Sequence, residues 1–358
     1  MGRGRVALVA GGYTGGHIQC ALAIAAALER AGTTCVLGGA DGGREVAAAA
    51  SSGYPIETVW IGPLDRAASA RGLARNLKFL VQLAVSRRQA RRALLRVRPD
   101  VVVGVGGYPS APFVLAAQSL GIPTVIHEAN ALPGLANRLL ARRARVVCLG
   151  DGAAANYFPK SVVTGNPVRP GLAAVPQAAA RARLGLRLED QVLLVTGGSL
   201  GSAVLNRWMV AAGTRLLAAG VHVVWQCGRA HLATLRDATP APVDYLDDMP
   251  AAYGAADLVV AAAGALTVAE LAHLGKPAVL VPAPDVTEDH QAQNARALAA
   301  RGVPVCAAAD VDAKLFDLVL GLLSDEERRR AAGAALAGSA DSGAAERIAE
   351  EALKLVRS

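Results

Sequence analysis

Short apolar runs that end in glycine-rich loops recur along the chain, and each is followed by a segment of helical composition. The first run, residues 6–10, meets the loop 11–16 and then an alanine-rich stretch that ends near Gly32. An apolar run that is too short for a helix and is ended by glycines predicts a buried parallel strand followed by a tight loop. A second strand is expected from residue 34, so the chain opens as strand, loop, helix and strand.

The loop 11–16 is a candidate for anion binding. Glycines let a backbone approach a ligand closely, and the helix that follows directs its unpaired amide groups toward that ligand. A phosphate is the natural guest at such a place. For a single loop, a tight turn without a ligand is an equally good interpretation. The pattern returns at 192–201, where an apolar run enters Gly197-Gly-Ser-Leu-Gly201, and this repeat favours ligand binding.

The internal repeat predicts the fold class. Further strand-to-loop junctions occur at 101–110 and 124–130, and the segment 257–277 parallels 100–123 at nearly the same spacing. We predict an α/β protein of two Rossmann-like domains that face a central cleft. The expected domains are 1–165 and 166–340, joined by a proline-containing linker, with a C-terminal helix in 341–358 that packs back across the domains. A chain of 358 residues suits two such domains.

The segment 66–98 is the most basic part of the chain, with ten Lys or Arg and no acidic residue. Its centre, 77–85, is apolar around most of a helix circumference. One interpretation is an ordinary surface helix with solvated arginines and leucines that face the core. The other is a helix, or a helix pair, at a membrane interface, where apolar residues enter the bilayer and arginines meet acidic headgroups. Nucleic-acid binding fits less well, because aromatic residues are only 4% of the chain and no recognised motif is present.

Composition and charge narrow the possible partners. The formal net charge is +8, and residues 1–165 carry 19 Lys and Arg against 8 Asp and Glu, while residues 166–358 carry 18 against 21. The basic half therefore suits an anionic surface. The apolar runs are shorter than the roughly 20 residues that a membrane span needs, and we expect no signal peptide. Five scattered cysteines predict buried thiols in a reducing cytoplasm, without a disulfide framework or a zinc site.

The second half offers the groups that a nucleotide diphosphate requires. Ser199 lies in the repeated glycine loop, where its hydroxyl could bond a phosphate oxygen. Residues 264–270 place a small-residue turn at a helix start, with Thr267 available for phosphate and Glu270 one turn later for ribose hydroxyls. A capping or helix-dipole role is an equally good interpretation of Glu270 when it is taken alone.

Two common nucleotide-binding patterns are excluded in the first half. No acidic residue ends the second strand, so the dinucleotide fingerprint is incomplete, and the phosphate-loop lysine is missing. His17 follows the first loop and could accept a proton from a substrate hydroxyl near neutral pH. On the residues alone, an ordinary histidine at a helix start is the favoured interpretation.

Nine short motifs, in a fixed order along the chain, indicate a resemblance to a known family. They are 14–18 (TGGHI), 105–110 (VGGYPS), 127–130 (HEAN), 133–137 (PGLAN), 164–169 (TGNPVR), 197–201 (GGSLG), 247–249 (DDM), 264–270 (GALTVAE) and 289–294 (DHQAQN). Each is weak alone, but in this order, over residues 6–301, the chain resembles the MurG family. Its members are UDP-N-acetylglucosamine-dependent N-acetylglucosaminyltransferases of peptidoglycan synthesis, and they are inverting enzymes of the GT-B fold.

The resemblance implies that the second half holds UDP-N-acetylglucosamine. Arg169 and Ser199 would serve the diphosphate or its surroundings, Leu246 would lie beside the uracil, and Gln291 would contact the sugar. Four further residues at the helix start, Ala265, Leu266, Thr267 and Val268, would line the phosphates. Glu270 would bind the ribose. The implied reaction needs no metal ion and no cofactor, and Asp247 and Asp248 match a family segment without a metal role.

The resemblance also assigns the first half to the acceptor. Thr14, Gly15 and Gly16 would face the acceptor and the donor sugar, with Asn130 nearby, and His17 becomes the candidate base on the acceptor 4-hydroxyl. The acceptor is a muramyl-pentapeptide linked to an undecaprenyl diphosphate, anchored at the cytoplasmic face of the cell membrane. The residues expected to meet that anionic surface, in a peripheral protein, are Arg71, Arg75, Leu77, Lys78, Phe79 and Leu80.

Five positions depart from the family pattern. Tyr13 replaces a third glycine, which matters if this position needs a positive φ. The other departures are Gln19, Cys20, Ala129, which replaces a Gln, and Ala262, which replaces an Arg before the donor loop. They support an alternative function: a UDP-sugar-binding homologue with an altered acceptor or without transfer activity, acting as a cell-wall scaffold.

Overall fold

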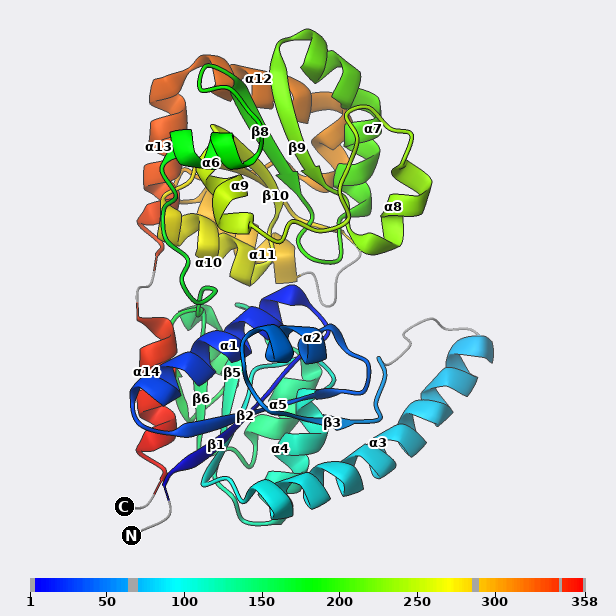
Figure 1. Cartoon of the computed structure of the whole chain (residues 1–358), viewed down its shortest axis with the longest axis vertical. Coiled ribbons are helices and arrows are strands. Elements are labelled where there is room, and N and C mark those ends of the chain that lie inside the picture. Colours follow the sequence, from blue (N-terminus) through cyan, green and yellow to red (C-terminus); the bar gives the residue numbers. More distant parts are fainter. Residues whose placement is uncertain (1–3, 64–69, 285–289, 341–342, 357–358) are drawn as a thin grey trace. The chain divides into compact units, whose positions relative to one another are not determined.

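The chain forms two compact α/β units. A computed structural model describes residues 4–63, 70–284, 290–340 and 343–356 (Figure 1). The first unit is Met1–Pro170 together with Gly343–Ser358, and the second is Gly171–Ser342. Each unit contains one sheet in which every strand pair is parallel. The prediction of two α/β units with parallel sheets is therefore confirmed.

The first unit is built around a seven-stranded sheet of order β3-β2-β1-β4-β5-β6-β7. Its strands are β1 (Val6–Ala10), β2 (Thr34–Ala40), β3 (Ile56–Val59), β4 (Val101–Gly104), β5 (Thr124–Glu128), β6 (Val146–Leu149) and β7 (Ser161–Val163). Its helices are α1 (Gly15–Arg30), α2 (Arg44–Ser51), α3 (Ala70–Val97), α4 (Ser110–Ser119), α5 (Leu135–Ala141), the short 3₁₀ helix η1 (Gly152–Tyr157) and α14 (Ala344–Leu353).

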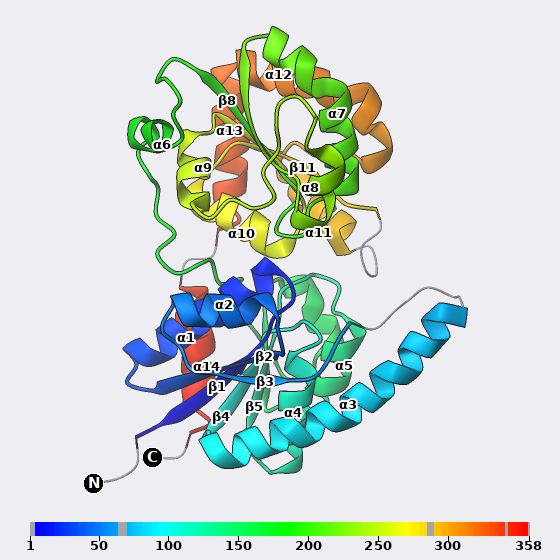
Figure 2. The same cartoon turned by 45° about the vertical axis from the view of Figure 1, so that its right-hand side comes forward.

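Two helical layers cover this sheet. On one side α1 contacts both α2 and α14, and α3, α4 and α5 form the other layer (Figure 2). Strands covered on both faces must be apolar along their whole length, and the central strand β4 is four consecutive buried residues, VVVG. Phe113 of α4 and Leu94 of α3 are buried in the core that lies under the second layer. The apolar runs in the sequence therefore correspond to central strands.

The C-terminal helix α14 belongs to the first unit. It packs against α1 and contacts β4 and β5. Arg30 of α1 and Glu346 of α14 form an ion pair of 2.5 Å at the surface. Arg347 donates from Nη2 to the carbonyl oxygen of Thr164 at 2.7 Å. These contacts connect the last helix to α1 and to the segment that follows β7.

The second unit has a four-stranded sheet of order β11-β10-β8-β9. Its strands are β8 (Gln191–Thr196), β9 (Val221–Gln226), β10 (Leu258–Ala262) and β11 (Ala278–Val281). Its helices are α6 (Gln177–Arg183), α7 (Ala203–Ala218), α8 (Arg229–Leu235), α9 (Met249–Ala255), α10 (Ala265–Leu274), α11 (His290–Ala299), η3 (Ala308–Asp310), η4 (Val311–Leu315), α12 (Phe316–Ser324) and α13 (Glu326–Ala337).

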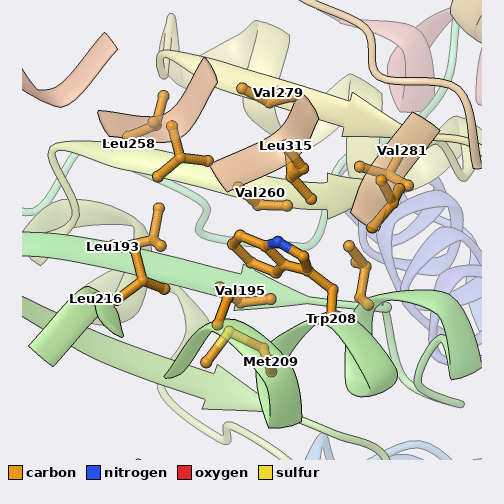
Figure 3. Packing of buried hydrophobic residues seen from close by; sticks show 14 of the residues in the cluster. Leu193, Val195, Trp208, Met209, Leu216, Leu258, Val260, Val279, Val281 and Leu315 are labelled. Carbon is orange, nitrogen blue, oxygen red and sulfur yellow. The ribbon is translucent and has the colours of Figure 1, made fainter. Parts of the chain in front are cut away.

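The core of the second unit lies between its sheet and the layer formed by α7 and α12. Trp208 of α7 is buried among side chains from β8 and β10, including Val195 and Val260, and Leu315 belongs to the same cluster (Figure 3). On the other face, α6 packs on α9 and α10 packs on α13. Because α10 begins directly after the central strand β10, its first turn is placed at the carboxyl edge of the sheet.

A matching carboxylate contact marks the internal repeat in both units. Asp100 Oδ2 accepts a hydrogen bond of 2.7 Å from the amide of Val6, at the start of β1. Asp257 Oδ2 accepts one of 2.7 Å from Val192, near the start of β8. In each unit, the residue that precedes a central strand thus ties down the neighbouring first strand. The spacing parallel between the two halves of the sequence reflects this shared construction.

The polar and sulfur-containing residues fit the sequence analysis. All five cysteines are buried and unpaired, as their scattered positions predict. Within the described ranges, no helix combines the length and the apolar character that crossing a bilayer requires.

Candidate active site

Three loops meet at the carboxyl edge of the first unit's sheet. They follow β1, β4 and β5, which are neighbours in the sheet. The loops after β1 and β4 pack so closely that a Cβ on Gly11 would lie 2.2 Å from Val105 Cγ2. A Cβ on Gly107 would lie 2.5 Å from the carbonyl oxygen of Gly12. The glycines of both motifs are therefore required for the contact between these two loops.

Thr14 positions His17 at the start of α1. Thr14 is the N-cap of the helix, and its Oγ1 accepts a hydrogen bond of 3.3 Å from the amide of His17. The same Oγ1 lies 2.9 Å from His17 Nδ1. When Nδ1 carries the ring proton and donates to Oγ1, Nε2 is the nitrogen that can accept a proton. The pair thus has the geometry of a general base oriented by a neighbouring hydroxyl.

Gly106 leaves the space that the His17 ring occupies. Its φ is +94°, and a Cβ at this position would lie 2.9 Å from His17 Nε2. The loop after β4 therefore passes directly over the nitrogen that could act as the base. Gly15 and Gly16, the other predicted residues of this loop, form the first turn of α1.

Tyr13 adopts the left-handed conformation that the glycine-rich pattern of the loop suggests for this position. Its φ is +73°, which is uncommon for a residue with a side chain. Its ring lies 5.2 Å from that of Tyr108, centroid to centroid, at an interplanar angle of 53°. The departure from glycine therefore falls at a position that does require a positive φ, and the replacing ring rests on the neighbouring loop.

Asn130 lies in the loop after β5, which a buried carboxylate organises. Glu128 Oε1 accepts from the Asn130 amide at 3.0 Å and from its Nδ2 at 3.2 Å. Glu128 Oε2 accepts from Gly134 N at 3.2 Å and from Asn137 Nδ2 at 2.9 Å. One carboxylate thus holds residues 128–137 together, so that Asn130 stays at the edge of the sheet beside the other two loops.

A buried histidine lies behind the His17 loop. His127 is fully buried, and its Nδ1 lies 3.5 Å from Cys20 Sγ. Burial is the main cause that lowers the pKa of His127 to about 4; a backbone hydrogen bond at Gly165 opposes this shift and the nearby His17 adds to it. Burial likewise raises the pKa of Cys148 to about 12 and that of Cys20 well above its usual range. These groups are therefore neutral near pH 7, and none of the three has the properties of a nucleophile or base there.

The second unit carries a corresponding set of loops after β8 and β10. Gly198 and Gly201 have φ values of +73° and +83°. A Cβ on Gly201 would lie 2.0 Å from the carbonyl oxygen of Cys227, so the loop is pressed against the end of β9. Ser199 lies within this loop. A Cβ on Gly198 would lie 4.0 Å from Thr267 Oγ1, so the structure brings the glycine loop and the first turn of α10 together.

Helix α10 presents the predicted phosphate-binding turn. Gly264 is its N-cap, and Ala265, Leu266, Thr267 and Val268 form its first turn. The unpaired amides of this turn point to the carboxyl edge of the sheet, where an anion would be stabilised. Ala262, one of the positions expected to depart from the family pattern, is the last residue of β10 and is buried.

Gln226 connects the glycine loop to Leu246 and was not predicted as a site residue. Its Nε2 donates to the carbonyl oxygen of Gly198 at 2.8 Å and to Thr196 Oγ1 at 3.2 Å. Its Oε1 accepts from the Leu246 amide at 2.8 Å. The predicted uracil neighbour and the predicted phosphate loop are thus joined by one buried carboxamide. In the sequence, Gln226 could have been found only as a polar residue at the end of a largely apolar strand.

Glu270 and Gln291 also have defined partners. Glu270 is buried, and its Oε2 accepts a hydrogen bond of 3.0 Å from the Tyr253 hydroxyl of α9. Gln291 Oε1 accepts from the Ala283 amide, just beyond β11, at 3.0 Å. Glu270 is thus held by α9, and Gln291 by the segment that follows β11. Arg169 belongs to the first unit, beside its Pro170 limit, whereas the other predicted donor residues belong to the second unit.

The predicted membrane residues lie on one long helix, α3. The side chains of Arg71, Arg75, Leu77, Lys78 and Leu80 lie outside those that the structure describes. Phe79 is partly buried and packs against the core of the first unit, which supports the surface-helix interpretation for this residue. Val81 of α3 is 52% exposed, and Leu135 and Leu139 of α5 are 61% and 52% exposed.

The described side chains contain no group of three or more His, Cys, Asp and Glu residues arranged to hold a metal ion.

Comparisons with known proteins cover both units of the chain. Residues 6–149 match the glycosyltransferase family 28 N-terminal domain, and residues 192–348 match the family's C-terminal domain. Two curated relatives are named UDP-N-acetylglucosamine--N-acetylmuramyl-(pentapeptide) pyrophosphoryl-undecaprenol N-acetylglucosamine transferase. The one from Salinibacter ruber is 42% identical, over 97% of this chain and 96% of its own. The one from Parabacteroides distasonis is 37% identical, over 98% of both.

The crystal structure of MurG from Acinetobacter baumannii is 28% identical to this chain and matches it with a TM-score of 0.71, over 98% of this chain and 100% of the crystallised one. The family matches cover both units. The chain belongs to glycosyltransferase family 28.

Proposed function

We propose that this protein transfers N-acetylglucosamine from UDP-N-acetylglucosamine to the 4-hydroxyl of undecaprenyl-diphosphate-linked N-acetylmuramoyl-pentapeptide. The observation that carries the proposal is the identity of 42% and 37%, over nearly the whole chain, with two transferases named for this reaction. The local geometry is consistent with it, because one unit offers an oriented histidine and the other an anion-binding turn beside a glycine loop. No metal ion or cofactor is part of the proposed reaction.

The proposed donor site is the carboxyl edge of the second unit. The diphosphate would lie against the glycine loop with Ser199 and the first turn of α10, whose amides stabilise the charge that develops on departing UDP. Leu246 would contact the uracil and Glu270 the ribose hydroxyls. Gln291 would contact the sugar. Arg169 would add a positive charge near the diphosphate.

The proposed acceptor site is the carboxyl edge of the first unit. Thr14, Gly15, Gly16 and Asn130 would bind the acceptor. The acceptor 4-hydroxyl oxygen attacks the anomeric carbon of the donor on the face opposite the phosphate, and the bond from that carbon to the UDP oxygen breaks. His17 Nε2 takes the hydroxyl proton as the new bond forms. The reaction therefore inverts the anomeric centre and releases UDP.

The test of the reaction uses labelled UDP-N-acetylglucosamine and a short-chain lipid-linked acceptor. We expect labelled disaccharide product and release of one UDP for each transfer. Binding of UDP without product would contradict the proposal and favour the alternative function, a UDP-sugar-binding scaffold. That alternative is motivated by the departures at Tyr13 and Ala262.

The role of His17 has its own test. His17→Ala should lower kcat by about 10²–10⁴-fold, the usual contribution of general base catalysis, with the donor Kd unchanged. His222→Ala, on β9 of the second unit, is the matched control and should keep its turnover. Equal turnover of His17→Ala and the parent protein would remove His17 from the mechanism.

We further propose peripheral binding to the cytoplasmic face of the cell membrane, through α3 and the neighbouring exposed residues of α5. The predicted contacts are Arg71, Arg75, Leu77, Lys78, Phe79 and Leu80. Exposed Leu135 and Leu139 support this surface, because α5 packs on α4, which packs on α3. Leu135→Ser with Leu139→Ser should weaken binding to phosphatidylglycerol vesicles. Val210→Ser, at an exposed position of α7, should leave it unchanged, and no binding of the parent protein at low salt would contradict the proposal.

A further inference from the structure

The Glu45 carboxylate lies inside the first unit, directly beneath the loop that carries His17. Glu45 is in the first turn of α2 and is 4% exposed. Its Oε1 accepts a hydrogen bond of 2.8 Å from the amide of Ala40, at the end of β2. Its Oε2 accepts one of 3.2 Å from the amide of Tyr13. Both carboxylate oxygens are therefore bound to backbone, and one of the two bonds goes to the residue with the unusual φ.

Three glycines enclose this carboxylate. A Cβ added to Gly12 would lie 2.4 Å from Glu45 Cδ, and one added to Gly43 would lie 2.4 Å from Oε1. A Cβ on Gly39 would lie 2.5 Å from Glu45 Cγ. The three residues come from the loop after β1, from β2 and from the turn before α2. Segments distant in sequence thus leave room for this one side chain.

Tyr13 needs an external constraint to stay in its turn. The amide of Thr14 donates to the carbonyl oxygen of Gly12 at 3.0 Å, so Tyr13 is the central residue of a tight three-residue turn with a φ of +73°. Such turns are rare for residues with a side chain, and they persist only where the surrounding structure holds them. The bond from Tyr13 N to Glu45 and the contact of its ring with Tyr108 are two constraints of this kind.

The constrained turn sets the position of the candidate base. Thr14 follows Tyr13 directly, caps α1, and contacts His17 Nδ1 at 2.9 Å. A change in the backbone at Tyr13 would therefore move the hydroxyl that orients the imidazole. We propose that Glu45 is a positioning residue for the transfer reaction, which holds Tyr13 in its left-handed turn and thereby places the Thr14–His17 pair. This inference rests on the proposed function of His17.

The test is a double-mutant cycle between Glu45 and Tyr13. Glu45→Gln keeps the size of the side chain but replaces one acceptor oxygen with a donor, which must face the amide of Tyr13 or that of Ala40. We expect kcat to fall about tenfold or more, as expected for a misplaced catalytic group, while the donor Kd stays unchanged. In the Tyr13→Gly background, where glycine adopts a positive φ without support, Glu45→Gln should lower kcat less than about threefold. Equal losses in both backgrounds would overturn the proposal.

Glu57→Gln is the matched control. Glu57 lies on β3 of the same sheet and pairs with Arg96 at 2.5 Å, away from the loop. We expect Glu57→Gln to leave kcat unchanged. This should hold both in the parent protein and in the Tyr13→Gly background. A Glu57→Gln loss as large as that of Glu45→Gln would mean that any lost carboxylate in this unit impairs turnover, and would overturn the proposal.

Amide hydrogen exchange separates failure of this proposal from failure of the proposed function. Glu45→Gln should speed exchange in the peptide that covers residues 11–18 and leave exchange of β4 and β5 unchanged. This readout needs no transfer activity, so it holds even if the protein proves to be a scaffold. Unchanged exchange in 11–18 would overturn the positioning role, whatever the activity of the parent protein.

Discussion

The Tyr253 hydroxyl donates a hydrogen bond of 3.0 Å to Oε2 of Glu270 in the interior of the second unit. Tyr253 is 1% exposed and Glu270 is 6% exposed. A tyrosine hydroxyl donates only one hydrogen bond, whereas a carboxylate has about four acceptor sites. The contact therefore fixes the direction of the Glu270 side chain in the second turn of α10. A carboxylate held in this way is suited to two adjacent ribose hydroxyls.

Glu270→Gln should weaken binding of UDP by roughly tenfold, because an amide can accept from fewer hydroxyls than a carboxylate. The decisive ligand is 2′-deoxy-UDP, which lacks one of the hydroxyls. The parent protein should bind it more weakly than UDP, and Glu270→Gln should discriminate less between the two. Titration calorimetry measures all four affinities. Equal discrimination by both proteins would separate Glu270 from the ribose.

Tyr253→Phe tests the support of that carboxylate. We expect loss of about 1 kcal/mol of stability from the missing hydrogen bond, together with weaker UDP binding. Urea unfolding and calorimetry on the same sample measure the two effects. A stability loss with full UDP affinity would mean that Tyr253 only packs the second unit and does not orient Glu270.

Gln226→Met should weaken UDP binding by about tenfold, because it removes the bonds from one side chain to Gly198, Thr196 and Leu246. Methionine is close to glutamine in size, so the core is preserved. Gln191→Met is the control, since Gln191 starts β8 and bonds the carbonyl oxygen of Leu323 at the other end of the sheet. If both variants lose the same affinity, the link from the glycine loop to Leu246 is not what matters.

The strands and loops of this protein were predictable from the sequence because a strand covered on both faces is a continuous run of apolar residues. In β4 and β8, unbroken apolar runs stop at glycines, and the structure places both sets of loops where these runs end. The spacing between the two halves also predicted two units of one kind. These signals are local, so they do not depend on which distant segments meet.

The residues that sequence reasoning missed depend on distant segments. Glu45 resembles an ordinary acidic residue in a helix first turn, and its burial arises only because Gly12, Gly39 and Gly43 converge on it. Gln226 is one polar residue at a strand end, and its three partners lie at 196, 198 and 246. The hydrophobic periodicity of the sequence does not indicate which distant residues meet in the fold. Tyr13 was partly predictable. The glycine-rich pattern indicated a positive φ at this position, but not that the Glu45 carboxylate binds the Tyr13 amide.

The buried His127 predicts a defined pH dependence of stability. Its pKa is lowered by burial to about 4, against about 6.5 in an unfolded chain. Below pH 6.5 the unfolded state takes up a proton that the folded state excludes, so stability falls as the pH drops from about 6.5 to about 4 and the contribution then levels off. The full loss is on the order of 3 kcal/mol for a shift of this size.

His127→Asn removes this titration and should flatten that part of the curve. Urea unfolding at several pH values between 7.5 and 4.5 gives the comparison, and the carboxylates common to both proteins cancel in the difference. The variant should lose stability at pH 7.5 but close part of the gap as the pH falls. Parallel curves over this range would show that His127 titrates in the folded protein as it does in the unfolded chain.

Gly106→Ala should show whether Gly106 matters because it leaves space for His17 or because glycine adopts a positive φ easily. Gly106 has a φ of +94°, and a Cβ there would lie 2.9 Å from His17 Nε2, so alanine forces the imidazole or the loop to move. Gly32 has a φ of +79° but has no atom within 4 Å of an added Cβ, which makes Gly32→Ala the matched control. Both variants should lose about 1–2 kcal/mol of stability from the left-handed conformation.

Only Gly106→Ala should also lose turnover, by about tenfold or more, because a displaced base no longer reaches the acceptor hydroxyl. Measurement of kcat beside urea unfolding distinguishes the two effects, and equal turnover of the two variants would mean that the contact between Gly106 and His17 has no part in the reaction.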